Sequence, residues 1–134
     1  MMRRFGVVLV VVSGLLALLV ACGGNDVPDN SRLVDAFDEG RSGVWLSGHG
    51  TVVQAFAPSG GSQRFLVRIQ ENFSVVVRHN IGDRGAVPAE RGDPIQFQGR
   101  YEFHGGGGEI LLTHADTAQP GGGGWIIHNG VRYD

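Results

Sequence analysis

The spacing of hydrophobic and polar residues divides the chain into an apolar leader, a polar linker and a series of short elements. Residues 5–21 are mainly Val, Leu and Ala and carry no charge. Between residues 31 and 39 the apolar positions follow helical spacing, which predicts a short helix with Asn30 or Ser31 as its N-cap and Gly40 as its stop.

From residue 44 onward the hydrophobic pattern changes to a period of two, which is typical of strands with one buried face. Strands are predicted at residues 45–56, 64–70, 74–81, 95–103 and 109–114. Gly99 falls on the apolar face of the fourth strand, where a missing side chain permits a bulge or a sharp coil. Asn129-Gly130 separates two further apolar segments, 125–128 and 131–133, and predicts a two-residue type I′ hairpin.

Five principal strands, a glycine-containing first strand and one helix favour a small closed barrel. The predicted fold is all-β, a five-stranded OB-like barrel with a short N-terminal helix and a C-terminal β-hairpin. A meander-like sandwich is the alternative. The predicted domain covers residues 31–134 and follows a signal peptide at 1–21 and a linker at 22–30.

The first 22 residues predict export and lipid attachment. Arg3 and Arg4 precede the apolar stretch, as in a secretory signal. The small residues before Cys22 resemble the lipobox of bacterial lipoproteins, which implies that the Cys22 thiol is diacylated, with palmitate as an expected acyl group, and that Cys22 becomes the new N-terminus. A plain transmembrane anchor is the alternative, although it needs roughly 20 apolar residues. Gly23, rather than Asp, favours the periplasmic face of an outer membrane, if the source has one.

The charge and composition of the chain limit the classes of partner that it is expected to bind. The 134 residues include 11 basic residues, all of them arginine, against 13 acidic ones, a net charge of −2. Processing at Cys22 removes Arg3 and Arg4 and leaves a net charge of −4, so no nucleic-acid partner is expected. The expected partners are the membrane, through the lipid anchor, and a protein or glycan of the cell envelope. A single cysteine excludes a disulfide framework.

Several short motifs occur in a specific order along the chain. They are His79-Asn80-Ile81, Gly92-Asp93, residues 99–103, Thr113-His114-Ala115-Asp116, residues 124–130 and Tyr133. Together they resemble the exported bacterial proteins grouped as domain-of-unknown-function family 3465. The hallmark of that family is His-Trp-Thr-His, and this chain has Leu111-Leu112-Thr113-His114 instead. The resemblance implies export but no established activity, and it implies that a multi-histidine site is depleted here.

Four residues are candidates for a ligand or metal site: His79, His114, Asp116 and His128. His114 and Asp116 are two residues apart, so they share a face of an extended chain. With His79 they offer the nitrogen and oxygen ligands that a metal site needs. The alternative is that these groups make structural hydrogen bonds at the barrel rim.

A second candidate site is a polar groove formed by Arg64, Arg68, Arg100 and Glu102 on the outer face of the barrel. OB barrels bind oligosaccharides and oligonucleotides on such faces, and a solvated ion-paired surface is the alternative. The sequence therefore favours a non-enzymatic, lipid-anchored OB-like module for a small ligand, glycan or envelope partner. The alternative is a metal-dependent hydrolase using His79, His114 and Asp116. No cofactor is identified, and enzymatic activity stays open.

Overall fold

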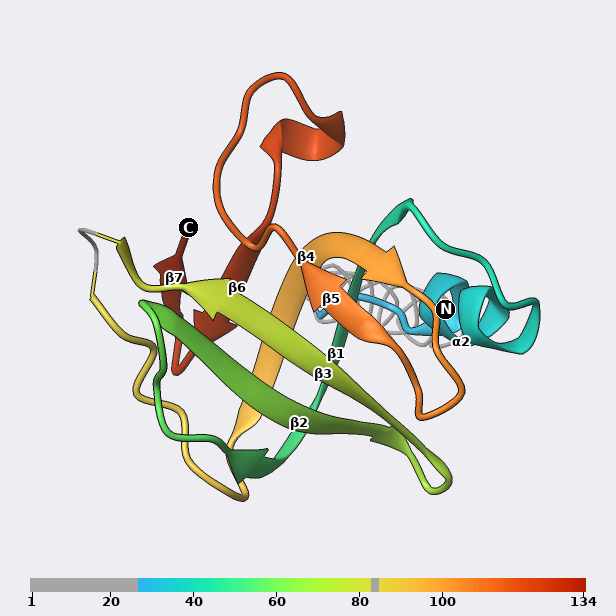
Figure 1. The fold of residues 1–134 in the computed structure, drawn as a ribbon, viewed down its shortest axis with the longest axis horizontal. Helices are drawn as coiled ribbons and strands as arrows, with labels where there is room; N and C mark the ends of the chain where they lie inside the picture. Colours follow the sequence, from blue (N-terminus) through green and yellow to red (C-terminus); the bar gives the residue numbers. More distant parts are fainter. Residues whose placement is uncertain (1–26, 83–84) are drawn as a thin grey trace, which may run out of the picture.

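A computed structural model describes residues 27–82 and 85–134, so the predicted signal peptide and Cys22 lie outside the described residues. These residues form one α-helix, one 3₁₀ turn and seven strands (Figure 1). In chain order they are α2 (Ser31–Asp38), β1 (Val44–Ala55), β2 (Ser62–Gln70), β3 (Phe73–Asn80), β4 (Pro94–Glu102), β5 (Glu109–Leu111), η2 (Pro120–Gly122), β6 (Trp125–His128) and β7 (Val131–Tyr133).

Five of the strands close into a barrel in the order β1-β2-β3-β5-β4, because β1 pairs with both β2 and β4. The first half of β1 pairs with β4, and its second half pairs with β2 across a bulge between Val52 and Gln54. The β3–β5 pair is parallel and the other pairs are antiparallel. The hairpin of β6 and β7 bonds to β4 outside the ring. The predicted OB-like barrel is confirmed, and the sandwich alternative is wrong.

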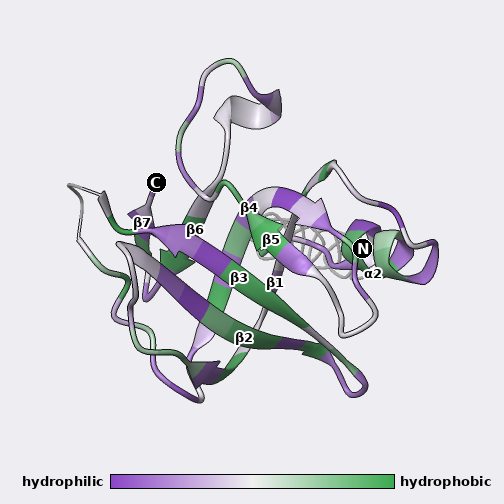
Figure 2. Ribbon diagram, in the orientation of Figure 1, coloured by the Kyte–Doolittle hydropathy of each residue, from purple (hydrophilic) through white to green (hydrophobic). Residues whose placement is uncertain are grey.

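Alternation along each strand builds the core. In β3 and β4 every second side chain is buried, including Val75, Val77, Phe97 and Tyr101. Hydrophobic residues occupy the middle of β2 and β3, whereas the start of β2 and the end of β3 are hydrophilic (Figure 2). The barrel therefore has an apolar centre and one polar end.

Each end of the barrel is closed by a different segment. Leu33 and Ala36 of α2 are buried in the core, and the ring of Phe37 stacks on Phe73 at the start of β3, with 4.5 Å between ring centroids. At the other end, where β3 finishes, Val87 and Ala89 of the β3–β4 loop are buried. The helix α2 and the β3–β4 loop thus bury apolar surface beyond what the five short strands bury among themselves.

The hairpin prediction is confirmed, because Asn129 and Gly130 have φ angles of 50° and 77°, as a type I′ turn requires. The fifth strand is shorter than predicted. It ends at Leu111 because Leu112 adopts a left-handed φ of 58°, which turns the chain out of the β5 ladder.

The structure corrects two further local expectations. Gly99 makes no bulge, since the β1–β4 register runs unbroken through it; a Cβ there would lie 2.3 Å from the Leu111 carbonyl oxygen, so this position serves the close approach of β5. The Asn30 side chain does not cap α2. Its amide instead makes two hydrogen bonds to the His49 backbone on β1, of 3.0 and 2.8 Å.

Candidate functional site

His79 is buried at the polar end of the barrel, with 2% of its surface exposed. Its Nδ1–H donates to the carbonyl oxygen and the hydroxyl oxygen of Thr113, at 3.1 and 2.8 Å, and the Thr113 hydroxyl donates in turn to the Arg78 carbonyl at 2.9 Å. Burial lowers the pKa of His79, because the charged imidazolium loses its hydration there. His79 thus makes the structural hydrogen bonds that were the alternative to a metal site.

His114 and Asp116 lie in the loop that joins β5 to β6. The Asp116 carboxylate accepts a hydrogen bond from the Ala118 N–H at 3.0 Å, which makes a local turn. The His114 carbonyl accepts from the Gly124 N–H at 2.7 Å. His114 is near enough to His79 to lower the pKa of His79 further. In residues 27–82 and 85–134 no group of three or more His, Cys, Asp or Glu side chains is placed to hold a metal ion.

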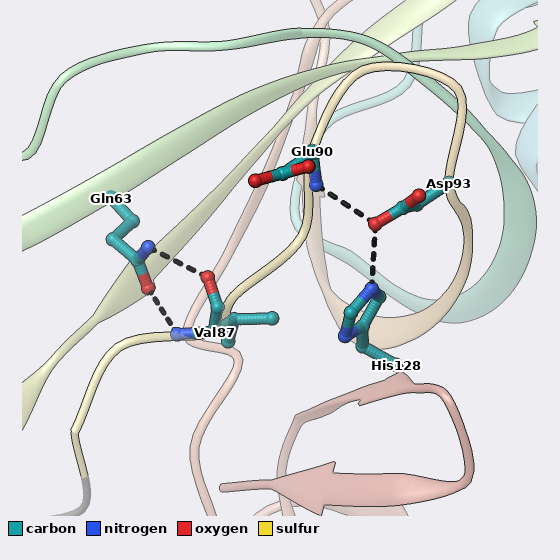
Figure 3. A network of polar contacts seen from close by, with 5 residues as sticks. All are labelled: Gln63, Val87, Glu90, Asp93 and His128. Atoms are coloured by element: carbon teal, nitrogen blue, oxygen red, sulfur yellow. Dashed lines mark hydrogen bonds and ion pairs between the residues drawn. The ribbon is translucent and has the colours of Figure 1, made fainter.

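His128, the fourth candidate, pairs with a carboxylate that the sequence analysis did not connect to it. Its Nε2 lies 2.8 Å from Asp93 Oδ2, which also accepts from the Glu90 N–H at 3.0 Å (Figure 3). The hydrogen bond from Glu90, followed by the one from His128, lowers the pKa of Asp93. The pair fastens the start of β4 to the end of β6.

Gln63 is a buried polar residue that the sequence analysis missed. Its amide makes two hydrogen bonds to the Val87 backbone, donating to the carbonyl at 3.0 Å and accepting from the N–H at 2.7 Å (Figure 3). A signal was present in the sequence, because Gln63 has the same parity as the buried Phe65 and Val67. A polar group on that face needs a buried partner.

The predicted polar groove is only partly assembled. Arg100 and Glu102 form an ion pair, with 3.0 Å between Arg100 Nε and Glu102 Oε1, and Arg78 lies 3.4 Å from Glu109 on the neighbouring β5. Arg64 is opposite Arg78 in the β2–β3 register, so it borders this charged belt. Arg68 does not, since it lies four residues farther along β2, about 13 Å away at strand spacing.

A cleft of about 330 Å³ lies between β1, β4 and the β6–β7 turn. It is lined by Val27, His49, Gly50, Pro94, Ile95, Gln96, Ile127, Asn129 and Gly130. Cross-strand register builds its floor, because Gln96 of β4 is opposite both His49 of β1 and Ile127 of β6.

One ring nitrogen of His49, a residue that lines the cleft, is engaged by the backbone. Its Nδ1 is 2.6 Å from the Pro28 carbonyl oxygen. A carbonyl only accepts, so Nδ1 carries the proton and Nε2 of the neutral ring is an acceptor. No described residue bonds to that Nε2. The cleft therefore combines apolar walls with an imidazole acceptor and the amide groups of Gln96 and Asn129.

A second, smaller hollow of about 200 Å³ lies farther along β1 and β4. It is lined by Arg32, Trp45, Leu46, Ser47, Gln98, Pro120 and Gly121. No helix in residues 27–82 and 85–134 has the length and apolar character needed to cross a membrane.

Comparison with known proteins finds a matching family model and a similar solved structure. The model of a family described as "Protein of unknown function (DUF3465)" matches residues 16–134. No curated protein matches the chain. Among solved structures the chain is similar to "OBody AM1L10 bound to hen egg-white lysozyme", with 19% identity over 66% of this chain and 83% of that chain and a TM-score of 0.42. The assignment of the fold rests on the strand pairing described above.

Proposed function

Since the chain belongs to the DUF3465 family, whose description assigns no function, we propose from its own geometry that it is a non-enzymatic binding module. Its cleft takes a small neutral ligand that bears hydroxyl and amide groups, and a lipid on Cys22 holds the protein in the cell envelope. The observation that carries this proposal is the cleft of about 330 Å³ with its mixed lining.

The lining matches the usual chemistry of small-ligand sites. Such sites have volumes of about 300–1,000 Å³, mostly apolar walls and a few polar groups that fix orientation. Here Val27, Pro94 and Ile127 supply the walls, and His49 Nε2 and the Gln96 amide supply an acceptor and a donor–acceptor pair. An N-acetylated sugar offers the complementary groups, because it carries a methyl, an amide and several hydroxyls.

Two features support binding rather than catalysis. The residues that line the cleft include no carboxylate, so a general acid–base pair of that kind is absent from the described lining. His79 and His128, two of the candidate chemical groups, already bond to Thr113 and Asp93 within the barrel.

Lipid attachment would place the cleft near a membrane surface. Val27 lines the cleft and follows Cys22 by five residues. Five residues span at most about 18 Å even when fully extended. A ligand in the cleft would thus be bound close to the membrane, on the periplasmic face of an outer membrane where the source has one.

Binding can be tested by titrating the ¹⁵N-labelled full chain with N-acetylglucosamine, in a detergent whose headgroup contains no sugar. We expect amide shifts confined to the cleft, above all at Gly50, Gln96 and Gly130. Gln96→Ala should weaken these shifts, whereas Gln54→Ala, at an exposed position of β1, should not. Absent or scattered shifts in the unsubstituted chain would refute the proposed site.

Anchoring is tested separately by mass spectrometry of the protein from native membranes. We expect an acylated Cys22 at the N-terminus, whereas Cys22→Ser should carry no acyl mass. An intact leader, or a bare thiol on the membrane-bound protein, would contradict lipidation and leave the cleft proposal standing.

A further inference from the structure

We propose that the smaller hollow beside Trp45 is a second sugar subsite, so that the outer face of β1, β4 and β6 binds a neutral oligosaccharide of N-acetylated sugars rather than one sugar. This inference rests on the proposed function, because it extends the ligand of the main cleft.

The two hollows lie on one continuous surface. The outward side chains of β1, β4 and β6 form parallel rows, one of which joins His49, Gln96 and Ile127 in the main cleft. The next row joins Ser47 to Gln98, and both residues line the second hollow. Adjacent rows on one face are two residues apart, which is about 7 Å. A chain molecule lying along β4 would contact both hollows.

The lining of the second hollow suits a sugar ring. The indole of the half-buried Trp45 gives an apolar surface with an N–H donor at its edge. The Gln98 Nε2–H donates to the Gly123 carbonyl at 2.6 Å, which fixes that amide and leaves its oxygen as an acceptor. Ser47 adds a hydroxyl, and the exposed Arg32 adds guanidinium donors.

Gly121 keeps the wall of this hollow open. Its φ is 67°, and a Cβ at this position would lie 3.0 Å from Gln98 Nε2. Any larger residue would therefore press on the amide that the subsite uses.

Charge favours a neutral glycan over a nucleic acid on this face. Arg100 is paired with Glu102 at 3.0 Å, and Arg132 is paired with Asp134 at 2.9 Å. Nucleic-acid binding depends on cations that neutralise phosphates and release counterions. Two of the arginines on or beside this face are already neutralised by carboxylates, whereas hydroxyl and acetamido groups need only hydrogen-bonding partners.

The test compares N-acetylglucosamine with its β-1,4-linked tetramer on the full chain in the sugar-free detergent. We expect the tetramer to bind at least about tenfold more tightly, a gain of about 1.4 kcal/mol, and to shift the Trp45 indole and Gly121 amide signals. Trp45→Ala should abolish the gain and leave monomer binding unchanged. Phe56→Ala removes another half-buried aromatic residue, just beyond β1, and should change neither affinity. Should Trp45→Ala fail to fold, Arg32→Ala on the surface of α2 should reduce tetramer affinity alone.

The outcomes separate the two proposals. Monomer binding in the main cleft, with no tighter binding of the tetramer and no shift at Trp45, overturns the second subsite but not the proposed function. Loss of cleft shifts with both sugars overturns the proposed function itself. Salt-sensitive binding of an oligothymidylate to the same face, in preference to the tetramer, overturns the assignment to a glycan.

Discussion

The Gln63 side chain should hold the β3–β4 loop in place, and its contribution to the free energy of unfolding can be measured. Gln63 has 6% of its surface exposed and Val87 has 2%, so both partners of their paired hydrogen bonds are buried. In Gln63→Ala the N–H and C=O of Val87 both lose their partner. Each unsatisfied buried group costs about 1–3 kcal/mol, so the variant should lose about 2–6 kcal/mol of unfolding free energy.

This loss is large against the 5–15 kcal/mol that stabilises a typical domain. We would measure it by urea unfolding of the full chain, with hydrogen exchange at Val87 and Ala89 as a local readout. Gln70→Ala is a matched control, because Gln70 is exposed at the other end of the same strand. It should cost less than about 0.5 kcal/mol.

A second substitution at the same position tests the geometry rather than the loss of size. Gln63→Glu keeps the acceptor that faces the Val87 N–H but places a carboxylate oxygen against the Val87 carbonyl. The folded state then favours the protonated carboxyl, which can donate, so the deficit should shrink as the pH falls through the raised pKa of that group. Equal stability of Gln63→Ala and Gln70→Ala, or the same deficit for Gln63→Glu at all pH values, would refute the reasoning.

Three further predictions follow from a close backbone approach, a buried phenol and a hydrogen-bonded carboxylate. Gly99→Ala should cost about 3 kcal/mol or more in urea unfolding, because a Cβ would lie 2.3 Å from the Leu111 carbonyl oxygen and β5 would have to move. Burial raises the pKa of Tyr101 to about 12, so ultraviolet titration should show this phenol ionising near pH 12; the stability it contributes is fully present below about pH 10 and lost as the pH rises through 12. The pKa of Asp93 is lowered by its hydrogen bonds, and the largest effect comes from the Glu90 N–H. The stability that Asp93 contributes is therefore present above the ordinary aspartate pKa and lost as the pH falls through the lowered value. The melting temperature of Asp93→Asn should depend less on acid pH than that of the parent protein.

Each of these predictions has its own contradicting result. Gly105→Ala is the control for Gly99→Ala, because no atom lies within 4 Å of the added Cβ, and equal costs for the two would contradict the close-approach argument. A Tyr101 signal that titrates near pH 10 in the folded chain would contradict its burial. An Asp93→Asn variant with the same acid dependence as the parent protein would assign that dependence to other carboxyls.

Local residue patterns in the sequence were sufficient to predict the strands and the hairpin turn. The Asn129-Gly130 turn needs two residues that tolerate positive φ, and that requirement is visible in two letters. The alternation in β3 and β4 places Val77 and Tyr101 on the buried face of the sheet, because side-chain direction in a strand has a fixed period of two. The number of strands and the length of the chain were then sufficient to predict a closed barrel.

The polar contacts were decided by tertiary structure. Gln63 and Val87 are 24 residues apart, His79 and Thr113 are 34 apart, and Asp93 and His128 are 35 apart. Alternation shows that Gln63 and His79 face the interior, but not which group meets them. Their partners lie on a loop or on another strand, and strand register and loop path bring them within hydrogen-bond distance.

The same division holds for the candidate site. Sequence spacing put His114 and Asp116 together, but Leu112 turns the chain out of the β5 ladder and leaves both residues in a loop. The cleft could not be predicted from the sequence because its lining comes from four separate segments. These are the stretch that precedes α2, strand β1, strand β4 and the β6–β7 hairpin. One-dimensional patterning determines which way each side chain faces, whereas a concave surface exists only once the barrel has closed and the hairpin has docked on β4.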